Sequence, residues 1–157
     1  MTNNRNRPRP DILFYIELSV IIGLLLFYAT STYKRNFIWK DNLSLWTDVV
    51  NKSPAKARPR NYLGLAYFEN SLIDKAIIQY KECISLNPFY SNAYNNLGVA
   101  YFKKGLADRA ITYFKYAIKM RPNHADAHYN LGIAYGEKGL TDEAYSEMRK
   151  GMELRRR

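Results

Sequence analysis

The residues of this chain that could perform catalysis or hold a metal are few and poorly placed for either task. Cys83 is the single cysteine of the sequence, so it cannot form an intramolecular disulfide, and no cysteine–histidine tetrad accompanies it. His124 and His128 are four residues apart, a spacing that presents two imidazoles on one helix face. No HExxH motif or third ligand accompanies them, and we therefore expect structural histidines.

Motifs for nucleotide or acyl chemistry are also absent from the sequence. It has no GxxxxGK[ST], GxGxxG or GxSxG element and no paired-acid arrangement. The sequence therefore predicts a protein that is not an enzyme and uses no cofactor or metal. We expect its function to depend on recognition of another molecule.

Length and charge narrow the kind of partner. The chain has 157 residues, with 24 Lys and Arg against 14 Asp and Glu, a formal charge of +10. This length suits one domain plus an appendage, and an apolar fraction of 47% is too high for a disordered chain. The basic residues are spread along the sequence, which favours anionic lipid or an acidic partner over nucleic acid.

Two segments precede the main part of the chain. Residues 1–11 are rich in Arg, Asn and Pro and are expected to form a basic disordered tail. Residues 12–33 are predicted to form a transmembrane helix, because the run from Ile12 to Thr30 has Glu17 as its one charge. A helix over that run would be roughly 28 Å long, about the thickness of the hydrocarbon core of a bilayer.

Two other interpretations of this apolar segment remain. A cleaved signal peptide is one, since Ala29-Thr30-Ser31 fits a small-x-small cleavage site, but the apolar run exceeds the usual length of about 7–15 residues. A buried core helix is the other, but a helix that is apolar on every face needs protein all round it. We therefore favour an uncleaved membrane anchor.

A period of 34 residues dominates the sequence from residue 57 onward. A Leu-Gly-x-Ala-Tyr segment occurs three times, and a small residue, a large residue and a second small residue follow each one at constant spacing. The repeated positions are Leu63–Tyr67, Leu97–Tyr101 and Leu131–Tyr135; Ala76, Ala110 and Ala144; Tyr80, Phe114 and Met148; Cys83, Ala117 and Gly151; and Pro54, Pro88 and Pro122. The period predicts three units, 57–90, 91–124 and 125–157.

Each unit is expected to be a pair of helices. The first helices are predicted at about 58–70, 91–104 and 125–138, and the second helices are predicted to begin near Asp74, Asp108 and Asp142. A glycine inside a helix costs about 1 kcal/mol relative to alanine, so its threefold recurrence needs a packing reason. We expect the large residue of the second helix, Tyr80 in the first unit, to approach the first helix at that glycine.

These markers resemble the tetratricopeptide repeat, over residues 57–157. The resemblance implies an all-α solenoid of three repeats, and residues 34–56 are expected to supply a linker and a capping helix, with Trp46 at the position of Tyr80. The third unit departs from the pattern at Met148 and Gly151. Part of an apolar face on the last helix, with Tyr145 and Met152, is expected to self-associate or to dock on a partner or a membrane.

The linker carries a second, shorter resemblance. Arg35-Asn36-x-x-Trp39 and Leu45-Trp46 are similar to a stretch that joins the last membrane helix to the repeats in transmembrane-and-TPR O-mannosyltransferases and their bacterial relatives. The resemblance implies an alternative function, as the non-catalytic tail or accessory portion of a membrane glycosyltransferase-like protein. It also implies repeats outside the cytoplasm, in the periplasm or an equivalent lumen. Basic residues on the two sides of the apolar run are balanced and do not decide the topology.

The resemblance also indicates where a partner would bind. First-helix residues three and four apart are expected to line a concave groove: Arg58, Tyr62, Leu65, Asn92, Asn96, Val99, Asp126, Asn130 and Ile133. In related arrays, asparagines like Asn96 and Asn130 bond to the backbone of an extended peptide; the alternative is that they bond only to neighbouring helices. The carboxylate clamp of chaperone-binding relatives is not expected here. The function predicted is a membrane-anchored scaffold that binds a protein or peptide.

Overall fold

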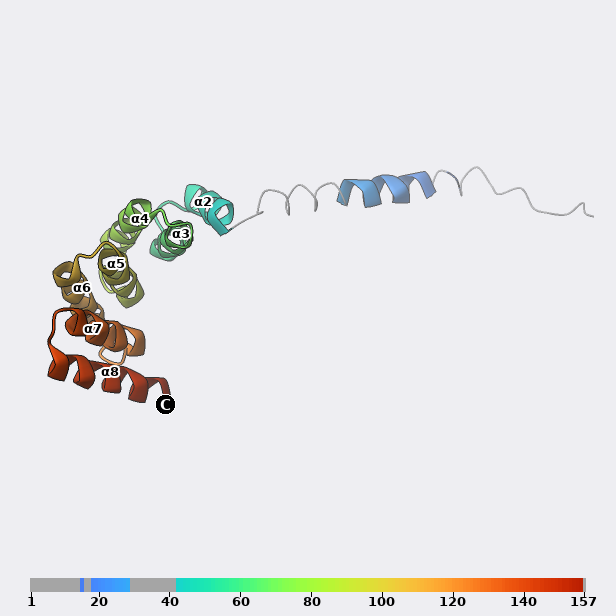
Figure 1. The fold of residues 1–157 in the computed structure, drawn as a ribbon. Coiled ribbons are helices and arrows are strands. Elements are labelled where there is room, and N and C mark those ends of the chain that lie inside the picture. The colour runs from blue at the N-terminus through green and yellow to red at the C-terminus, as the bar shows by residue number, and fades with distance from the viewer. Residues whose placement is uncertain (1–14, 16–17, 29–41, 157) are drawn as a thin grey trace, which may run out of the picture. The chain divides into compact units, whose positions relative to one another are not determined.

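The computed structural model describes residue 15, residues 18–28 and residues 42–156. It divides into two units, Met1–Lys40 and Asp41–Arg157, which are described separately. In the first unit residues 18–28 are helical (Figure 1). Among the described residues, no helix is both long enough and apolar enough to cross a membrane.

Several predictions fall on the N-terminal part of the chain. The basic tail at 1–11 and the linker residues before 42 lie outside the described residues, as do both ends of the transmembrane helix predicted at 12–33. These assignments stay predictions.

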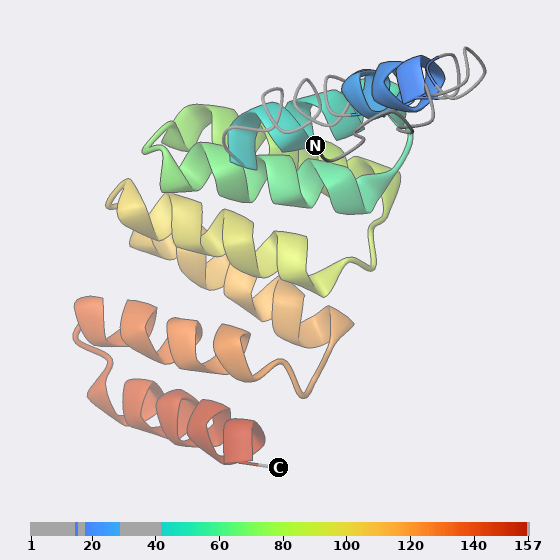
Figure 2. The ribbon, with the colours of Figure 1, turned by 90° about the vertical axis from the view of Figure 1, so that its right-hand side faces the viewer.

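The second unit is a curved succession of helices that runs from α2 at the top to α8 at the bottom of Figure 1, and its described residues contain no strand. Its helices are α2 (Asn42–Lys52), α3 (Ala57–Glu69), α4 (Ile73–Leu86), α5 (Ser91–Lys103), α6 (Ala107–Met120), α7 (Ala125–Glu137) and α8 (Thr141–Arg156). Successive pairs stack in layers (Figure 2), with α3, α5 and α7 on the inner side of the curve and α4 and α6 on its outer side (Figure 1). The all-α solenoid of helix pairs is confirmed.

The turns inside the pairs depend on a left-handed residue at the same place in each unit. Ser71 has φ of 60°, and Gly105 and Gly139 have φ of 74°. This conformation ends the first helix, and the amide of the next residue, Leu72 in the first unit, donates to the carbonyl of Tyr67 at 2.9 Å. The second helices begin one residue before Asp74, Asp108 and Asp142, whose carboxylates complement the helix dipole.

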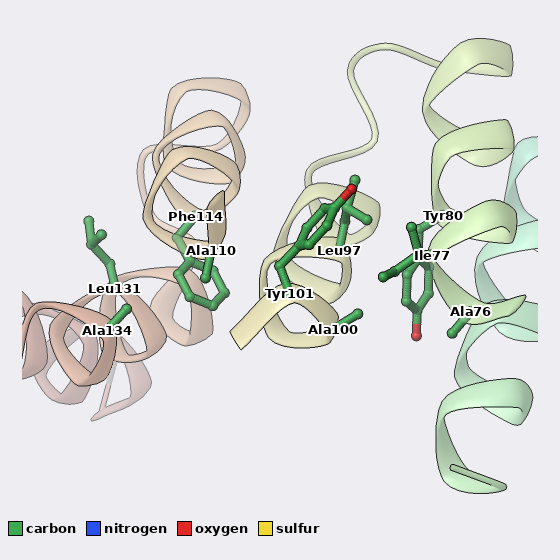
Figure 3. Packing of buried hydrophobic residues seen from close by; sticks show 10 residues of the cluster. All are labelled: Ala76, Ile77, Tyr80, Leu97, Ala100, Tyr101, Ala110, Phe114, Leu131 and Ala134. Carbon is green, nitrogen blue, oxygen red and sulfur yellow. The ribbon is translucent and has the colours of Figure 1, made fainter. Parts of the chain in front are cut away.

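The core runs through the stack as a row of side chains from α4, α5, α6 and α7 (Figure 3). Its largest fully buried members are Tyr80 and Phe114, each 1% exposed. An added Cβ at Gly64 would lie 2.5 Å from the Tyr80 ring, and one at Gly98 would lie 2.6 Å from the Phe114 ring. These distances confirm the packing reason expected for the repeated glycines.

Trp46 lies in the helix expected to cap the repeats, but it is less buried than Tyr80 and Phe114 at the corresponding repeat positions. It occupies the repeat position of Tyr80 but is only half-buried, and its ring stacks on Tyr62 with centroids 4.5 Å apart and planes at 14°. The reason is that α2 is a second helix without a first helix before it in the described part of this unit. The large side chain therefore packs on the following helix, α3.

We predict that Gly98→Ala destabilises the protein although alanine is the better helix former. The added methyl group meets the Phe114 ring, and such overpacking typically costs about 1–3 kcal/mol. Gly136→Ala is the matched control, because its Cβ would lie an ordinary 3.9 Å from Ala144 and should stabilise the helix by up to about 1 kcal/mol. Urea unfolding of both variants measures the two free energies; a gain in stability for Gly98→Ala would contradict this account.

Candidate peptide-binding groove

The nine predicted groove residues lie on α3, α5 and α7, three on each inner helix, and none of them is buried. Arg58, Asn92, Asp126 and Ile133 are exposed, and the other five are half-buried. Leu65 and Val99 also pack against the core. The row therefore presents polar groups with a few apolar side chains between them.

Two asparagine pairs connect the inner helices of successive repeats. Asn96 Nδ2 donates to Asn61 Oδ1 at 3.0 Å, and Asn130 Nδ2 donates to Asn95 Oδ1 at 3.0 Å. Asn61 is 3% exposed and Asn95 is 8% exposed, so each bond satisfies a buried carbonyl oxygen. The structure therefore shows Asn96 and Asn130 bonded to a neighbouring helix, as one of the two alternatives expected. Each donor amide keeps a second N–H and its own carbonyl oxygen for other contacts.

Contacts within a repeat also engage the polar residues near the start of α5 and α7, because an arginine at the end of each unit reaches back to them. Arg121 donates to Asn92 Oδ1 at 2.9 Å, and Arg155 donates to Asp126 Oδ1 at 2.6 Å. The Asp126 carboxylate is therefore compensated within the fold. Arg58 is the other charged residue of the predicted row. Its guanidinium contacts Tyr62 and has no carboxylate partner among the described residues.

A hollow of about 690 Å³ lies at the α2 end of this row. Three aromatic side chains and two cations form most of its wall: Trp46, Tyr62, Tyr90, Lys56 and Arg58. The Arg58 guanidinium carbon lies 5.7 Å from the centre of the Tyr62 ring. We refer to this cavity as the aromatic hollow.

The electrostatics of the aromatic hollow favour an anion next to an apolar group. The hydrogen bond with Tyr62 raises the pKa of Arg58 above its ordinary value, and burial raises the pKa of Tyr90. The arginine is thus charged and the phenol neutral at physiological pH. None of the residues that line the hollow is acidic.

Sequence reasoning found two residues of the aromatic hollow, Arg58 and Tyr62, and missed the others. Trp46 was assigned to the capping helix, and Tyr90 immediately precedes α5. Within the described residues of this unit no first helix precedes α2, and Trp46 stacks there on Tyr62 of α3.

The histidines and the cysteine are structural. His128 is 1% exposed; its Nδ1 lies 2.5 Å from Glu147 Oε2 and its Nε2 lies 2.9 Å from the carbonyl oxygen of Pro122. His124 is 4% exposed, and its Nε2 has no hydrogen-bond partner. Burial raises the pKa of the Cys83 thiol to about 11, so Cys83 is an unreactive core residue.

Comparison with known proteins agrees with the repeat architecture. The TPR repeat matches residues 64–105, and the tetratricopeptide repeat matches residues 91–124 and 113–145. A crystal structure of MamA is 31% identical in sequence, with a TM-score of 0.65 over 73% of this chain and 67% of that chain. MamA MSR-1 is 27% identical, with a TM-score of 0.61 over 83% and 71%. A search of curated protein sequences found no match.

The fold, the repeated glycine contacts and these similarities define the class of protein. The chain belongs to the tetratricopeptide repeat family, and the MamA structures are among the solved structures to which it is similar. The resemblance of the linker to O-mannosyltransferase-like membrane proteins stays a prediction.

The last helix leaves part of its apolar face uncovered. Tyr145 is 71% exposed and Met152 is 42% exposed, whereas Ile77, at the repeat position of Tyr145, is 8% exposed because the next repeat covers it. Self-association through this edge stays a prediction.

We predict that His124 makes the fold sensitive to acid. Burial chiefly, and Arg121 next, lower its pKa from 6.5 to about 4, although Asp126 acts in the opposite direction and His128 adds a smaller lowering effect. The unfolded chain therefore binds the proton first, so stability falls as the pH drops from about 6.5 to 4, by up to about 3 kcal/mol.

His124→Asn removes this titration and keeps a polar residue at the start of α7. Urea unfolding of the two proteins between pH 4 and 7 measures the difference, with the carboxylates common to both. A parallel loss of stability in the variant and the native protein would contradict this assignment.

Proposed function

We propose that this chain is a membrane-anchored scaffold that binds an extended peptide segment of a partner protein along α3, α5 and α7. The observation that carries the proposal is the aromatic hollow, which lies at one end of the predicted row of groove residues. Tetratricopeptide repeat proteins bind protein partners, and this cavity provides a defined starting point for such a segment.

The composition of the aromatic hollow indicates the chemistry of that peptide. Rings of Trp46, Tyr62 and Tyr90 accept an apolar or aromatic side chain, whose burial is worth about 1.5–3 kcal/mol. Arg58 and Lys56 at the same cavity attract a carboxylate on an adjacent residue. Farther along the row, the remaining amide groups of Asn96 and Asn130 suit a peptide backbone.

The anchor rests on the apolar segment before the repeats. Val20, Ile21 and Leu25 are 53–63% exposed in the described helical residues 18–28, and such a concentration of exposed apolar side chains is typical of a surface that lipid or protein covers. The uncharged run that contains them favours lipid. We place the repeats on the non-cytoplasmic side.

We predict that the full chain selects acidic peptides with an apolar residue from a random displayed library, and that Lys56→Gln with Arg58→Gln weakens their binding about five- to tenfold. Both side chains are exposed, so folding should be unaffected. The matched control is Lys103→Gln with Lys150→Gln, which removes the same charge from exposed positions elsewhere. Titration of a selected fluorescent peptide measures the three dissociation constants.

Equal weakening in the test pair and the control pair would show a general charge effect and would refute the groove assignment. Alanine at Asn96 is a poorer test, because it leaves the buried carbonyl oxygen of Asn61 without its donor. The resulting loss of about 1–3 kcal/mol of stability would obscure the effect on binding.

We predict that protease digests the repeats in cells whose outer barrier is opened while the inner membrane stays sealed. The reason is the resemblance of the linker to proteins whose repeats follow a final membrane helix. A cytoplasmic marker protein controls for leakage. Protection of the repeats until detergent is added would show that the repeats lie on the cytoplasmic side and would contradict this topology. Release of the intact chain from membranes by carbonate would contradict the proposed membrane anchor.

A further inference from the structure

Every carboxylate of the two outer helices α4 and α6 forms an ion pair with a cation from outside its own helix. Asp74 Oδ1 lies 2.5 Å from Lys104 Nζ, and Asp108 Oδ1 lies 2.5 Å from Lys138 Nζ. Glu82 pairs with Arg60 of α3. No acidic group of α4 or α6 is therefore left to neutralise the basic residues of these two helices.

The basic residues of the same helices have no carboxylate partner in the described part of the chain. They are Lys75 and Lys81 on α4 and Arg109, Lys115 and Lys119 on α6, and all five are exposed. Three of them lie over tyrosine rings instead: Lys75 over Tyr67 at 5.7 Å, Arg109 over Tyr101 at 5.6 Å and Lys115 over Tyr135 at 5.6 Å. The outer side thus carries positive charge among aromatic groups.

A second hollow, of about 500 Å³, lies among these residues, and we refer to it as the outer hollow. Its lining consists of two cations, three phenols and one hydroxyl group: Lys81, Arg109, Tyr101, Tyr113, Tyr116 and Thr112. The Thr112 hydroxyl already donates to the Asp108 carbonyl oxygen at 2.9 Å. The groups left to face a ligand are therefore the cations and the phenols.

Two tyrosine rings of the outer hollow stack on each other, and the third lies tilted beside them. Tyr101 and Tyr113 have centroids 5.3 Å apart and planes at 7°, and Tyr116 lies 6.4 Å from Tyr113 and 5.8 Å from Tyr94. Because their faces are partly occupied, they are poorly disposed to stack with nucleic-acid bases. Their hydroxyl groups and ring edges remain, and phenolic O–H groups are good donors to carboxylates.

We propose that the outer hollow binds an acidic segment of a protein partner, with carboxylates on Lys81 and Arg109 and an aromatic or apolar side chain against Tyr113 and Tyr116. The partner chemistry follows from charge complementarity, since two unpaired cations and no carboxylate line the cavity. Four of the six lining residues belong to α6 and one belongs to α4, the two helices on the outer side of the curve (Figure 1).

This site is independent of the groove on α3, α5 and α7, because the two hollows share no lining residue. The scaffold would therefore bind two partner segments, one on each side of the repeats. If one of the two proposed binding sites is refuted, the other can still be tested.

The experiment uses the purified full chain in a neutral detergent and a fluorescent peptide of repeated Glu-Glu-Tyr, with a Gln-Gln-Tyr peptide as the uncharged probe. We expect binding of the first peptide alone, and about five- to tenfold weaker binding in Lys81→Gln with Arg109→Gln. The pair Lys103→Gln with Lys150→Gln removes the same charge and should have little effect. Circular dichroism confirms folding of each variant.

Three results would overturn the proposal. Equal weakening in the control pair would assign binding to net charge. Weakening in Lys56→Gln with Arg58→Gln, with no effect of the outer pair, would place the acidic peptide in the aromatic hollow. Failure of the peptide to bind, with binding of phosphatidylglycerol vesicles or single-stranded DNA that depends on Lys81 and Arg109, would assign the surface to lipid or nucleic acid.

Discussion

The contact between a large side chain of one helix and a glycine of its partner is the interaction on which the rest of this structure depends. Tyr80 at Gly64 and Phe114 at Gly98 bring the two helices of a repeat so close that a single methyl group would not fit. Each interior glycine costs about 1 kcal/mol in helix propensity, whereas burying the aromatic side chain is worth about 1.5–3 kcal/mol. The balance favours the close approach, and its repetition every 34 residues produces a stack in which one helix of each pair lines the inner side.

The features inside a repeat were predictable from the sequence because they depend on contacts between residues close in the chain. The glycines, the left-handed turns and the helix starts at Asp74 and Asp108 are local, and the helices begin and end within about a residue of the expected positions. The contact at Gly64 involves a residue only sixteen positions away, so the period identified both partners.

Contacts between repeats were not predictable in the same way. The bonds from Asn96 to Asn61 and from Asn130 to Asn95 depend on how two inner helices cross, which no period specifies. The stacking of Trp46 on Tyr62 joins α2 to α3, and no later repeat in the described part of the chain has an equivalent contact at that position, because Tyr80 and Phe114 pack instead on glycines of their own repeats. The aromatic hollow and the outer hollow both lie where helices of neighbouring repeats, or α2 and the first repeat, meet. The sequence therefore indicated the row of groove residues on the inner helices but not these two cavities.

The ion pairs between repeats matter more for surface charge than for stability. Asp74 and Asp108 have side chains that are 81% exposed, and pairs at such positions contribute about 0–1 kcal/mol each. Their larger effect is to neutralise Asp74 of α4 and Asp108 of α6 with Lys104 and Lys138, the residues that directly follow α5 and α7. The remaining cations of the outer helices then face a ligand without competition from carboxylates of α4 and α6, because those carboxylates are already paired.

The stacking of helix pairs in a solenoid places the aromatic hollow and the outer hollow in different parts of the surface. The inner helices contribute Arg58 and Tyr62 to one hollow, and α5 and α6 contribute most of the other, while the core of Tyr80, Leu97 and Phe114 lies between the helices of the stack. Because each repeat contacts only its neighbours, a ligand on one side orders a few helices and need not displace the groups on the other. The packing that forms the stack therefore also lets a short chain present one aromatic site and one basic site to different partners.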